Sequence, residues 1–182
     1  DIDKDNQLNM LLNSDKLLLQ LIDNDGKLAK TVDITNTLPK LTEDKYFGVY
    51  IDNQNRRWIT TFESGVACQE KQSYFKYTTQ SGLQTNRIIA VYQDNTGCIW
   101  FGSRGSGLIK FKDRSFTYFD DLVGLNDGEV FSIQPDSSGN IWIGTHMNGL
   151  YKFDGKKVVS YNNNPLFKKF NIRSICLLKN KK

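Results

Sequence analysis

The sequence has few residues of several kinds, and each shortage excludes a class of protein. Its 182 residues include one histidine, three prolines and three cysteines with no Cys-x-x-Cys pair. Cys68, Cys98 and Cys176 therefore indicate neither a zinc site nor a complete disulfide framework, and we expect buried single thiols. Few prolines with 12% aromatic residues are typical of a folded domain and exclude a collagen-like or disordered chain.

Long apolar runs and a charge of one sign are also missing. The longest apolar stretches, at 17–22 and 88–92, are far shorter than the ~20 residues that span a bilayer. The first residues lack the basic and apolar regions of a signal peptide, which leaves the compartment open. A net charge of +4 arises from 24 basic and 20 acidic residues that are interspersed, so we expect no nucleic-acid partner.

What the sequence does contain is a repeat of 42 residues. Internal repeats decide the fold class, so they are sought first. The repeat is defined by residue types that recur at this step: Trp58, Trp100 and Trp142; Asp52, Asp94 and Asp136; Gly65, Gly107 and Gly149.

Each repeat is expected to form four short strands, because its apolar runs are four to seven residues long and are bounded by Gly, Asn, Asp or Ser. In the repeat that starts near Arg87, the strands are predicted to end at Gln93 and then to span 98–103, 107–112 and about 116–119. Four strands in 42 residues are typical of a β-propeller blade. We expect the tryptophans to pack between blades, the turn glycines to adopt positive φ, and Asp94 and Asp136 to bond to turn amides.

The whole chain is therefore predicted to be one all-β segment, a partial ring of about four blades. The predicted parts are a degenerate blade at 1–45, blades at 46–86, 87–128 and 129–171, and the first strand of a further blade at 172–182. In the degenerate blade we expect strands near 8–12, 16–22 and 27–32 and a hairpin turn at 23–26. A partial ring leaves blade faces uncovered, so we expect the remaining propeller blades or a second copy to cover them.

Two segments carry a family resemblance. Residues 136–145 with 149–153, and 94–103 with 107–111, resemble the two-component regulator propeller repeat, whose pattern is Asp-x-x-Gly-x-Ile-Trp-x-Gly-Thr followed by Gly-Leu-x-x-Phe. In the repeat around Trp58, Asn55 and Thr60 replace the glycines. The resemblance implies the periplasmic sensor region of a hybrid two-component system, of the kind found in Bacteroidetes. It also implies carbohydrate sensing, an oligosaccharide ligand, a homodimeric parent sensor and signal transduction to a histidine kinase outside this segment.

No catalytic or cofactor motif is found. Residues 1–6 resemble a calcium loop, but Asn6 replaces its glycine and Leu12 its glutamate, so no metal is expected. The glycine-rich stretch 102–107 joins two strands and precedes no helix, so it is no phosphate loop. We expect no cofactor and no catalytic residue. A propeller lyase and a structural or protein-docking propeller without a small-molecule site stay open as alternatives.

A ligand is expected at the blade end where the inner strand starts and where the second and third strands are joined. The 42-residue step places Phe62, Arg104 and His146 at one equivalent position, and Lys45, Arg87, Glu129 and Asn171 at another. Residues that vary at equivalent positions of a repeat are candidates for function. The predicted ligand-binding residues are Phe62, Arg87, Arg104, Glu129 and His146.

Overall fold

The computed structural model describes residues 8–13, 17–22, 27–33, 46–119, 125, 129–167 and 170–176. Its regular structure in these ranges consists of antiparallel strands and one turn of 3-10 helix, η1 (Thr79–Ser81). Among the same residues, no helix is long and apolar enough to cross a membrane. The predicted all-β fold is confirmed.

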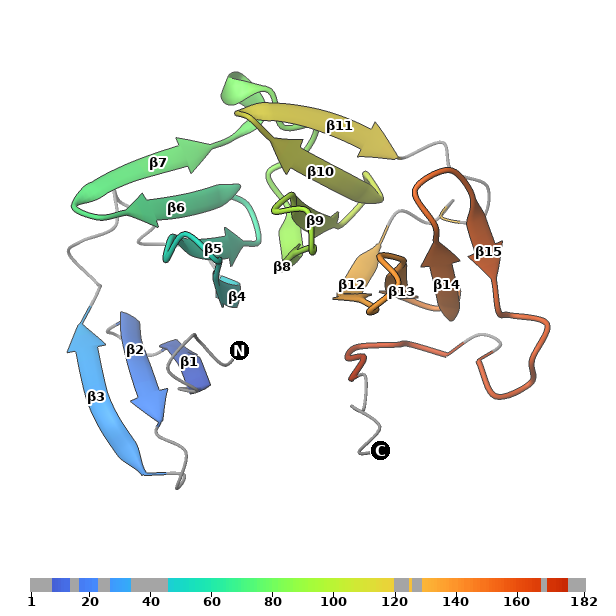
Figure 1. The fold of residues 1–182 in the computed structure, drawn as a ribbon, viewed down its shortest axis with the longest axis horizontal. Helices are drawn as coiled ribbons and strands as arrows, with labels where there is room; N and C mark the ends of the chain where they lie inside the picture. Colours follow the sequence, from blue (N-terminus) through green and yellow to red (C-terminus); the bar gives the residue numbers. More distant parts are fainter. Residues whose placement is uncertain are drawn as a thin grey trace. The chain divides into compact units, whose positions relative to one another are not determined.

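The first of two compact units covers residues 1–88 and holds two sheets. β1 (Leu8–Asn13), β2 (Leu17–Ile22) and β3 (Leu28–Asp33) form a three-stranded sheet (Figure 1). β4 (Tyr46–Ile51), β5 (Arg57–Thr61), β6 (Val66–Glu70) and β7 (Ser73–Tyr77) form a four-stranded sheet in sequence order. The strands of the degenerate blade lie where the sequence predicts them, whereas the predicted turn at 23–26 lies outside the described residues.

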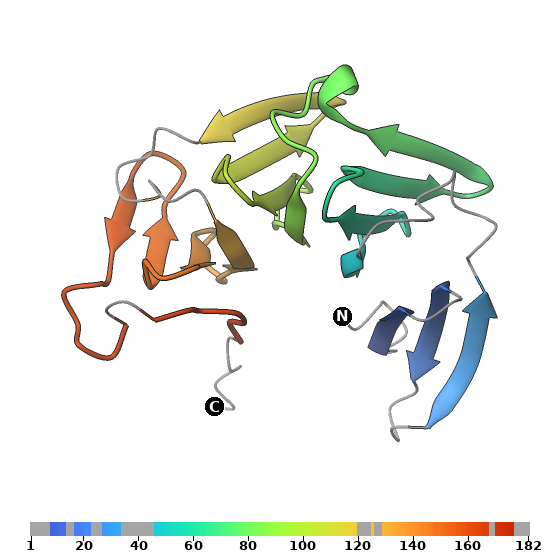
Figure 2. The ribbon, with the colours of Figure 1, turned by 180° about the vertical axis from the view of Figure 1, so that it is seen from behind.

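The second unit covers residues 89–182 and holds two four-stranded sheets. One consists of β8 (Ile88–Gln93), which begins at the unit boundary, β9 (Ile99–Ser103), β10 (Leu108–Lys112) and β11 (Ser115–Phe119). The other consists of β12 (Val130–Pro135), β13 (Ile141–Thr145), β14 (Leu150–Phe153) and β15 (Val158–Ser160). Figure 2 shows from behind that neighbouring strands follow the chain order, which is the meander of a propeller blade.

The core of the second unit lies between its two sheets. Trp100 is 4% exposed, and its ring contacts Phe153 of the other sheet edge-on, with 5.9 Å between centroids. Phe119 contacts both rings, at 5.5 and 5.1 Å. Aromatic pairs at these distances add to the stabilisation that burial supplies. The predicted packing of a repeat tryptophan between two blades is therefore present for Trp100.

The repeated aspartate ties the first turn of each blade to the tryptophan. In the blade of Trp100, Asp94 Oδ1 accepts from the amides of Thr96 (2.9 Å) and Cys98 (3.0 Å), and Oδ2 accepts from the indole Nε1 (2.7 Å). Trp58 and Trp142 donate in the same way to Asp52 (2.8 Å) and Asp136 (3.1 Å). Each carboxylate thereby fixes the turn and the indole at once.

The structure differs in part from two expectations, on the cysteines and on the strand predicted at 172–182. Cys68 and Cys98 are buried free thiols, as expected, but Cys176 is exposed and lies outside the strands that the structure describes. In the predicted next strand at 172–182, residues 172–176 form no strand, and 177–182 lie outside the described residues. Ile172 still donates its amide to the Thr145 carbonyl (3.0 Å), and its own carbonyl accepts from Ser132 Oγ (3.2 Å).

Candidate ligand-binding site

The hairpin between the second and third strands of each blade has one fixed conformation. The buried hydroxyls of Thr61, Ser103 and Thr145 each donate to the carbonyl of the glycine four residues later, at 2.9, 2.9 and 3.0 Å. The backbone amides of the same three residues donate to the same carbonyls. Each glycine has a positive φ, of 81° at Gly65 and 60° at Gly107, which favours glycine there. The residue after each hydroxyl therefore leaves the sheet from an equivalent position.

In the first unit, this position holds Phe62, which lies under a guanidinium. The Cζ atom of Arg87 lies 5.5 Å from the centroid of the Phe62 ring, within the range of a cation–π contact. The Phe62 ring also contacts Phe47, with 5.6 Å between centroids. Phe47 is 46% exposed, so the cluster presents an aromatic surface and a cation to solvent.

In the second unit, the predicted residues Arg104 and His146 both contact the Glu129 carboxylate. Glu129 accepts from Arg104 Nε at 2.5 Å through Oε1, and its Oε2 lies 3.1 Å from Nδ1 of His146. The backbone adds to this, because the His146 amide donates to the Glu129 carbonyl at 3.0 Å. The side chains of Arg104 and His146 are 45% and 37% exposed, and Glu129 is 17% exposed. The carboxylate therefore positions two basic groups that remain accessible to a ligand.

A β-bulge places an additional aromatic residue in each cluster. The pairing of β4 with β5 is shifted between Tyr46 and Gly48, and that of β12 with β13 between Val130 and Ser132. The residues left unpaired are Phe47 and Phe131, and bulges of this kind redirect side chains near functional sites. Phe131 contacts the His146 ring with 5.2 Å between centroids. Both phenylalanines belong to the site, and the sequence analysis did not identify them.

The segment after the last blade adds two further residues to the cluster of the second unit. Arg173 Cζ lies 5.4 Å from the centroid of the Phe131 ring. Asn171 Oδ1 accepts from the Met147 amide at 2.8 Å. The 42-residue step links Phe47, Phe131 and Arg173, so extending the alignment of the repeats by two positions would have identified all three.

Each residue at the predicted hairpin position lies close to the residue at the predicted inner-strand position that follows it by 25 residues in the sequence. Phe62 contacts Arg87, Arg104 contacts Glu129, and Asn171 bonds to the residue after His146. Lys45 lies outside the described residues. The cluster around Phe62 belongs to the first unit, and the cluster around Glu129 belongs to the second. All five predicted ligand-binding residues thus lie in a cluster with at least one other of them.

The side chains of these clusters are suited to hydroxyl-rich ligands. Arginine and glutamate offer directional donors and acceptors, and exposed aromatic faces can stack on apolar ring surfaces. Among the described residues, no group of three or more His, Cys, Asp or Glu side chains is placed to hold a metal ion.

Comparison with known proteins supports the repeat assignment. Residues 82–105 and 124–147 match the family described as two component regulator propeller. Both segments are therefore repeats of this family, which confirms the resemblance that the sequence indicates. No curated protein is similar enough to the chain to match it.

Solved structures share the fold. The extracellular domain of a protein described as a hybrid two component system of B. thetaiotaomicron is 24% identical, with a TM-score of 0.68 over 96% of this chain and 25% of that chain. A second such domain from B. thetaiotaomicron is 20% identical, with a TM-score of 0.62 over 90% and 24%. The virginiamycin B lyase of Staphylococcus aureus is 15% identical, with a TM-score of 0.68 over 88% and 53%. The chain thus spans about a quarter of the first two extracellular domains and about half of the lyase chain.

Proposed function

We propose that the chain is a ligand-sensing segment from the periplasmic part of a hybrid two-component system, and that it recognises a carbohydrate. The observation that carries the proposal is the pair of two component regulator propeller repeats at 82–105 and 124–147. The similar domains from B. thetaiotaomicron are described as extracellular and as parts of such systems, which supports the same placement. In this proposal the segment binds and does not catalyse, and the kinase lies elsewhere in the parent protein.

The clusters at the hairpins support a carbohydrate as the ligand. Arg104 and His146 are held by one carboxylate, and the ring of Phe131 lies against His146. This combination offers hydrogen-bonding side chains beside an aromatic surface, with Arg104 and His146 partly exposed. A sugar ring has hydroxyls around its edge, which would bond to the polar side chains, and C–H groups on its faces, which would pack against the aromatic ring.

A glycan array followed by calorimetry on the hits tests this proposal. We expect at least one oligosaccharide to bind, and we expect Phe131→Ala and Arg104→Ala each to weaken binding about tenfold, equal to about 1.4 kcal/mol. Lys156→Ala is the control, because this exposed lysine lies in the hairpin between β14 and β15, at the other strand ends from the hairpin between β13 and β14, and should leave affinity unchanged. Absence of binding to every glycan would contradict the proposal and favour a structural or protein-docking propeller.

A lyase is the second candidate, and one observation favours it. His146, the single histidine of the chain, lies 3.1 Å from a glutamate carboxylate, and a histidine beside a carboxylate can act as a general base. A catalytically inactive variant of the virginiamycin B lyase has a histidine replaced by alanine. Turnover of quinupristin or of a polysaccharide that is lost in His146→Ala would replace the sensor by a lyase. Binding without turnover supports the sensor.

A further inference from the structure

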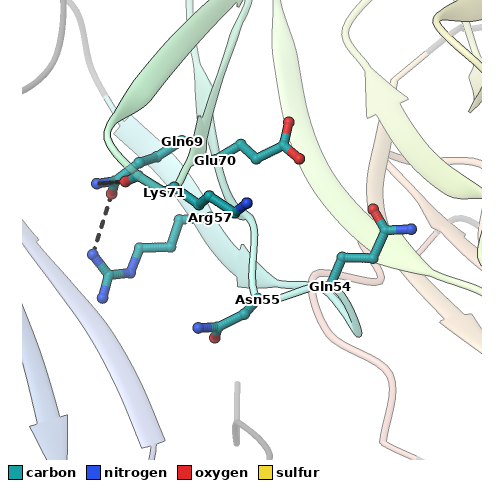
Figure 3. Close-up of a pocket in the computed structure, with 6 residues that line it drawn as sticks. All are labelled: Gln54, Asn55, Arg57, Gln69, Glu70 and Lys71. Carbon is teal, nitrogen blue, oxygen red and sulfur yellow. Dashed lines mark hydrogen bonds between the residues drawn. The ribbon is translucent and has the colours of Figure 1, made fainter.

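A polar pocket lies on the blade of β4 to β7, at the opposite strand ends from Phe62. Its volume is about 310 Å³, at the small end of the ~300–1,000 Å³ of ligand pockets. Figure 3 shows its lining, which comes from the turn before β5, the first residue of β5, the end of β6 and the turn after β6: Gln54, Asn55, Arg57, Gln69, Glu70 and Lys71.

The pocket exists because this blade departs from the repeat at two paired positions. In the sister blades, Ile99 pairs across the sheet with Phe111, and Ile141 with Phe153. These four side chains are at most 4% exposed. The blade of β4 to β7 has Arg57 paired with Gln69 at these positions. The two residues precede the pair of the next blade by 42 residues and that of the last blade by 84. A cation and an amide therefore replace a buried apolar pair.

The polar pair is preorganised. Arg57 Nη1 donates to Gln69 Oε1 at 3.2 Å, as the dashed line in Figure 3 marks, and Gln69 Nε2 donates to the Lys71 carbonyl at 3.2 Å. The glutamine is thus bonded at both ends of its amide, and it fixes the guanidinium through one of its five N–H donors. The guanidinium has further donors with which to bind a ligand.

The turns around this pair also depart from the repeat. Asn55 has a φ of 61° where the sister blades have Gly97 and Gly139, both at 83°. Lys71 has a φ of 55°, where one sister blade has Gly155 at 94° and the other has Asp113 at 49°. A side chain at such a φ is strained by about 1 kcal/mol or more, although asparagine tolerates it better than lysine. Both sister blades have glycine at the position of Asn55, so the side chain of Asn55 calls for another explanation, whereas the position of Lys71 also holds a side chain, Asp113, in one of them.

We propose that this pocket is a second binding site, for a mono- or disaccharide held by hydrogen bonds. The lining offers two cationic donors, Arg57 and Lys71, and one carboxylate, Glu70, along with three amides that both donate and accept. A hydroxyl also donates and accepts, so a small polyhydroxylated ligand fits this mixed set better than a simple anion or an apolar group. The site is separate from the hairpin clusters and does not depend on their function.

Amide-resolved NMR of the 182-residue chain tests the proposal, with glucose, galactose, xylose, glucuronate and their disaccharides as probes and inorganic phosphate as the counter-probe. We expect at least one sugar to give saturable shifts at residues 54–57 and 69–71 at up to millimolar concentration. Shifts at 104, 129 and 146 report the hairpin cluster, so failure of the proposed function and failure of this inference appear at different amides.

A second test uses variants in which residues of this blade are replaced by those that the sister blades have at the same positions. Asn55→Gly adopts the residue of both sister blades and Lys71→Gly that of the last blade, so both should fold, and each should weaken sugar binding at least severalfold. Arg57→Ile with Gln69→Phe restores the apolar pair and should abolish the shifts. Lys156→Ala, in the corresponding hairpin of the last blade, should change nothing.

Three outcomes would overturn the inference. They are the absence of saturable shifts with every sugar, binding of phosphate alone, and unchanged affinity in all the folded variants that carry sister-blade residues.

Discussion

Asp94 is a single residue whose hydrogen bonds stabilise the first turn of its blade and the repeat tryptophan. Its two oxygens accept from two turn amides and one indole at 2.7–3.0 Å. Asp94→Asn keeps the size but turns one acceptor into a donor that faces another donor. We expect the free energy of unfolding to fall by about 1–3 kcal/mol, measured by urea denaturation. Asp113→Asn, in an exposed turn, should change it by less than about 0.5 kcal/mol, and equal effects would contradict this role.

Gly102 is fixed by its surroundings and not by its backbone angle. A Cβ atom there would lie 2.7 Å from Val130 Cγ1 and 2.8 Å from the Val130 carbonyl oxygen. We expect Gly102→Ala to lower the free energy of unfolding, measured by urea denaturation, by about 1–3 kcal/mol through overpacking.

Gly139 provides the comparison for this variant. It has a φ of 83°, and a Cβ atom added to it would meet nothing within 4 Å, so Gly139→Ala tests backbone strain alone, at about 1 kcal/mol. A smaller effect at Gly102 than at Gly139 would show that the contact with Val130 yields easily. Thr60 occupies the position equivalent to Gly102 and is fully buried, so the neighbours and not the repeat decide which residue fits.

At the scale of the strand, burial should set the order of local stability. Every side chain of β9 is buried, and in β13 only Trp142 is partly exposed. β15 has three residues, none of them buried, and it lies at the edge of its sheet. We expect the amides of β15 to exchange with deuterium well before those of β9 and β13, because edge strands with few buried contacts open locally. Equal protection of β13 and β15 would show that this sheet opens only as a whole.

Strand positions were predictable, but strand irregularities were not. Apolar runs between turn residues predicted the strands of the Trp100 blade to within one or two residues of β8 to β11. Nothing local in the sequence marks Phe47 and Phe131 as bulged, since a bulge depends on how two strands pair. The repeat alignment predicted Glu129 and His146 but stopped two positions before Phe131, whose ring contacts both His146 and Arg173.

At the scale of the whole chain, the repeated carboxylates should make the fold sensitive to acid. Burial by itself would raise the pKa of Asp94, but hydrogen bonds from Trp100, Thr96 and Cys98 together outweigh it, and the pKa lies below its usual value. Burial also opposes the lowering of the Asp136 pKa, which bonds from Asn140, Trp142 and the Ser138 amide together bring about. A lowered folded-state pKa means that these aspartates stabilise the fold fully above the unfolded value of about 3.9 and less as the pH falls below it.

Urea midpoints measured across pH check this expectation. We expect them to be level between about pH 7 and 5 and to fall below about pH 4. The double variant Asp94→Asn with Asp136→Asn should be less stable at pH 7 and should lose less stability on acidification. An acid slope as steep as that of the unaltered chain would assign the sensitivity to other groups.

The sequence by itself determined the blades, because their information is local and repeated. A 42-residue step, short apolar runs and Asp-x-x-Gly turns each depend on neighbours within a few residues, and two matched segments repeat them. The tertiary structure alone decided which side chains meet. Phe62 with Arg87, Arg104 with Glu129, the bulged phenylalanines and the pocket at Arg57 and Gln69 all come from contacts between separate strands or between the loops at their ends. Such contacts depend on strand pairing and packing, which the residue pattern of a single strand does not specify.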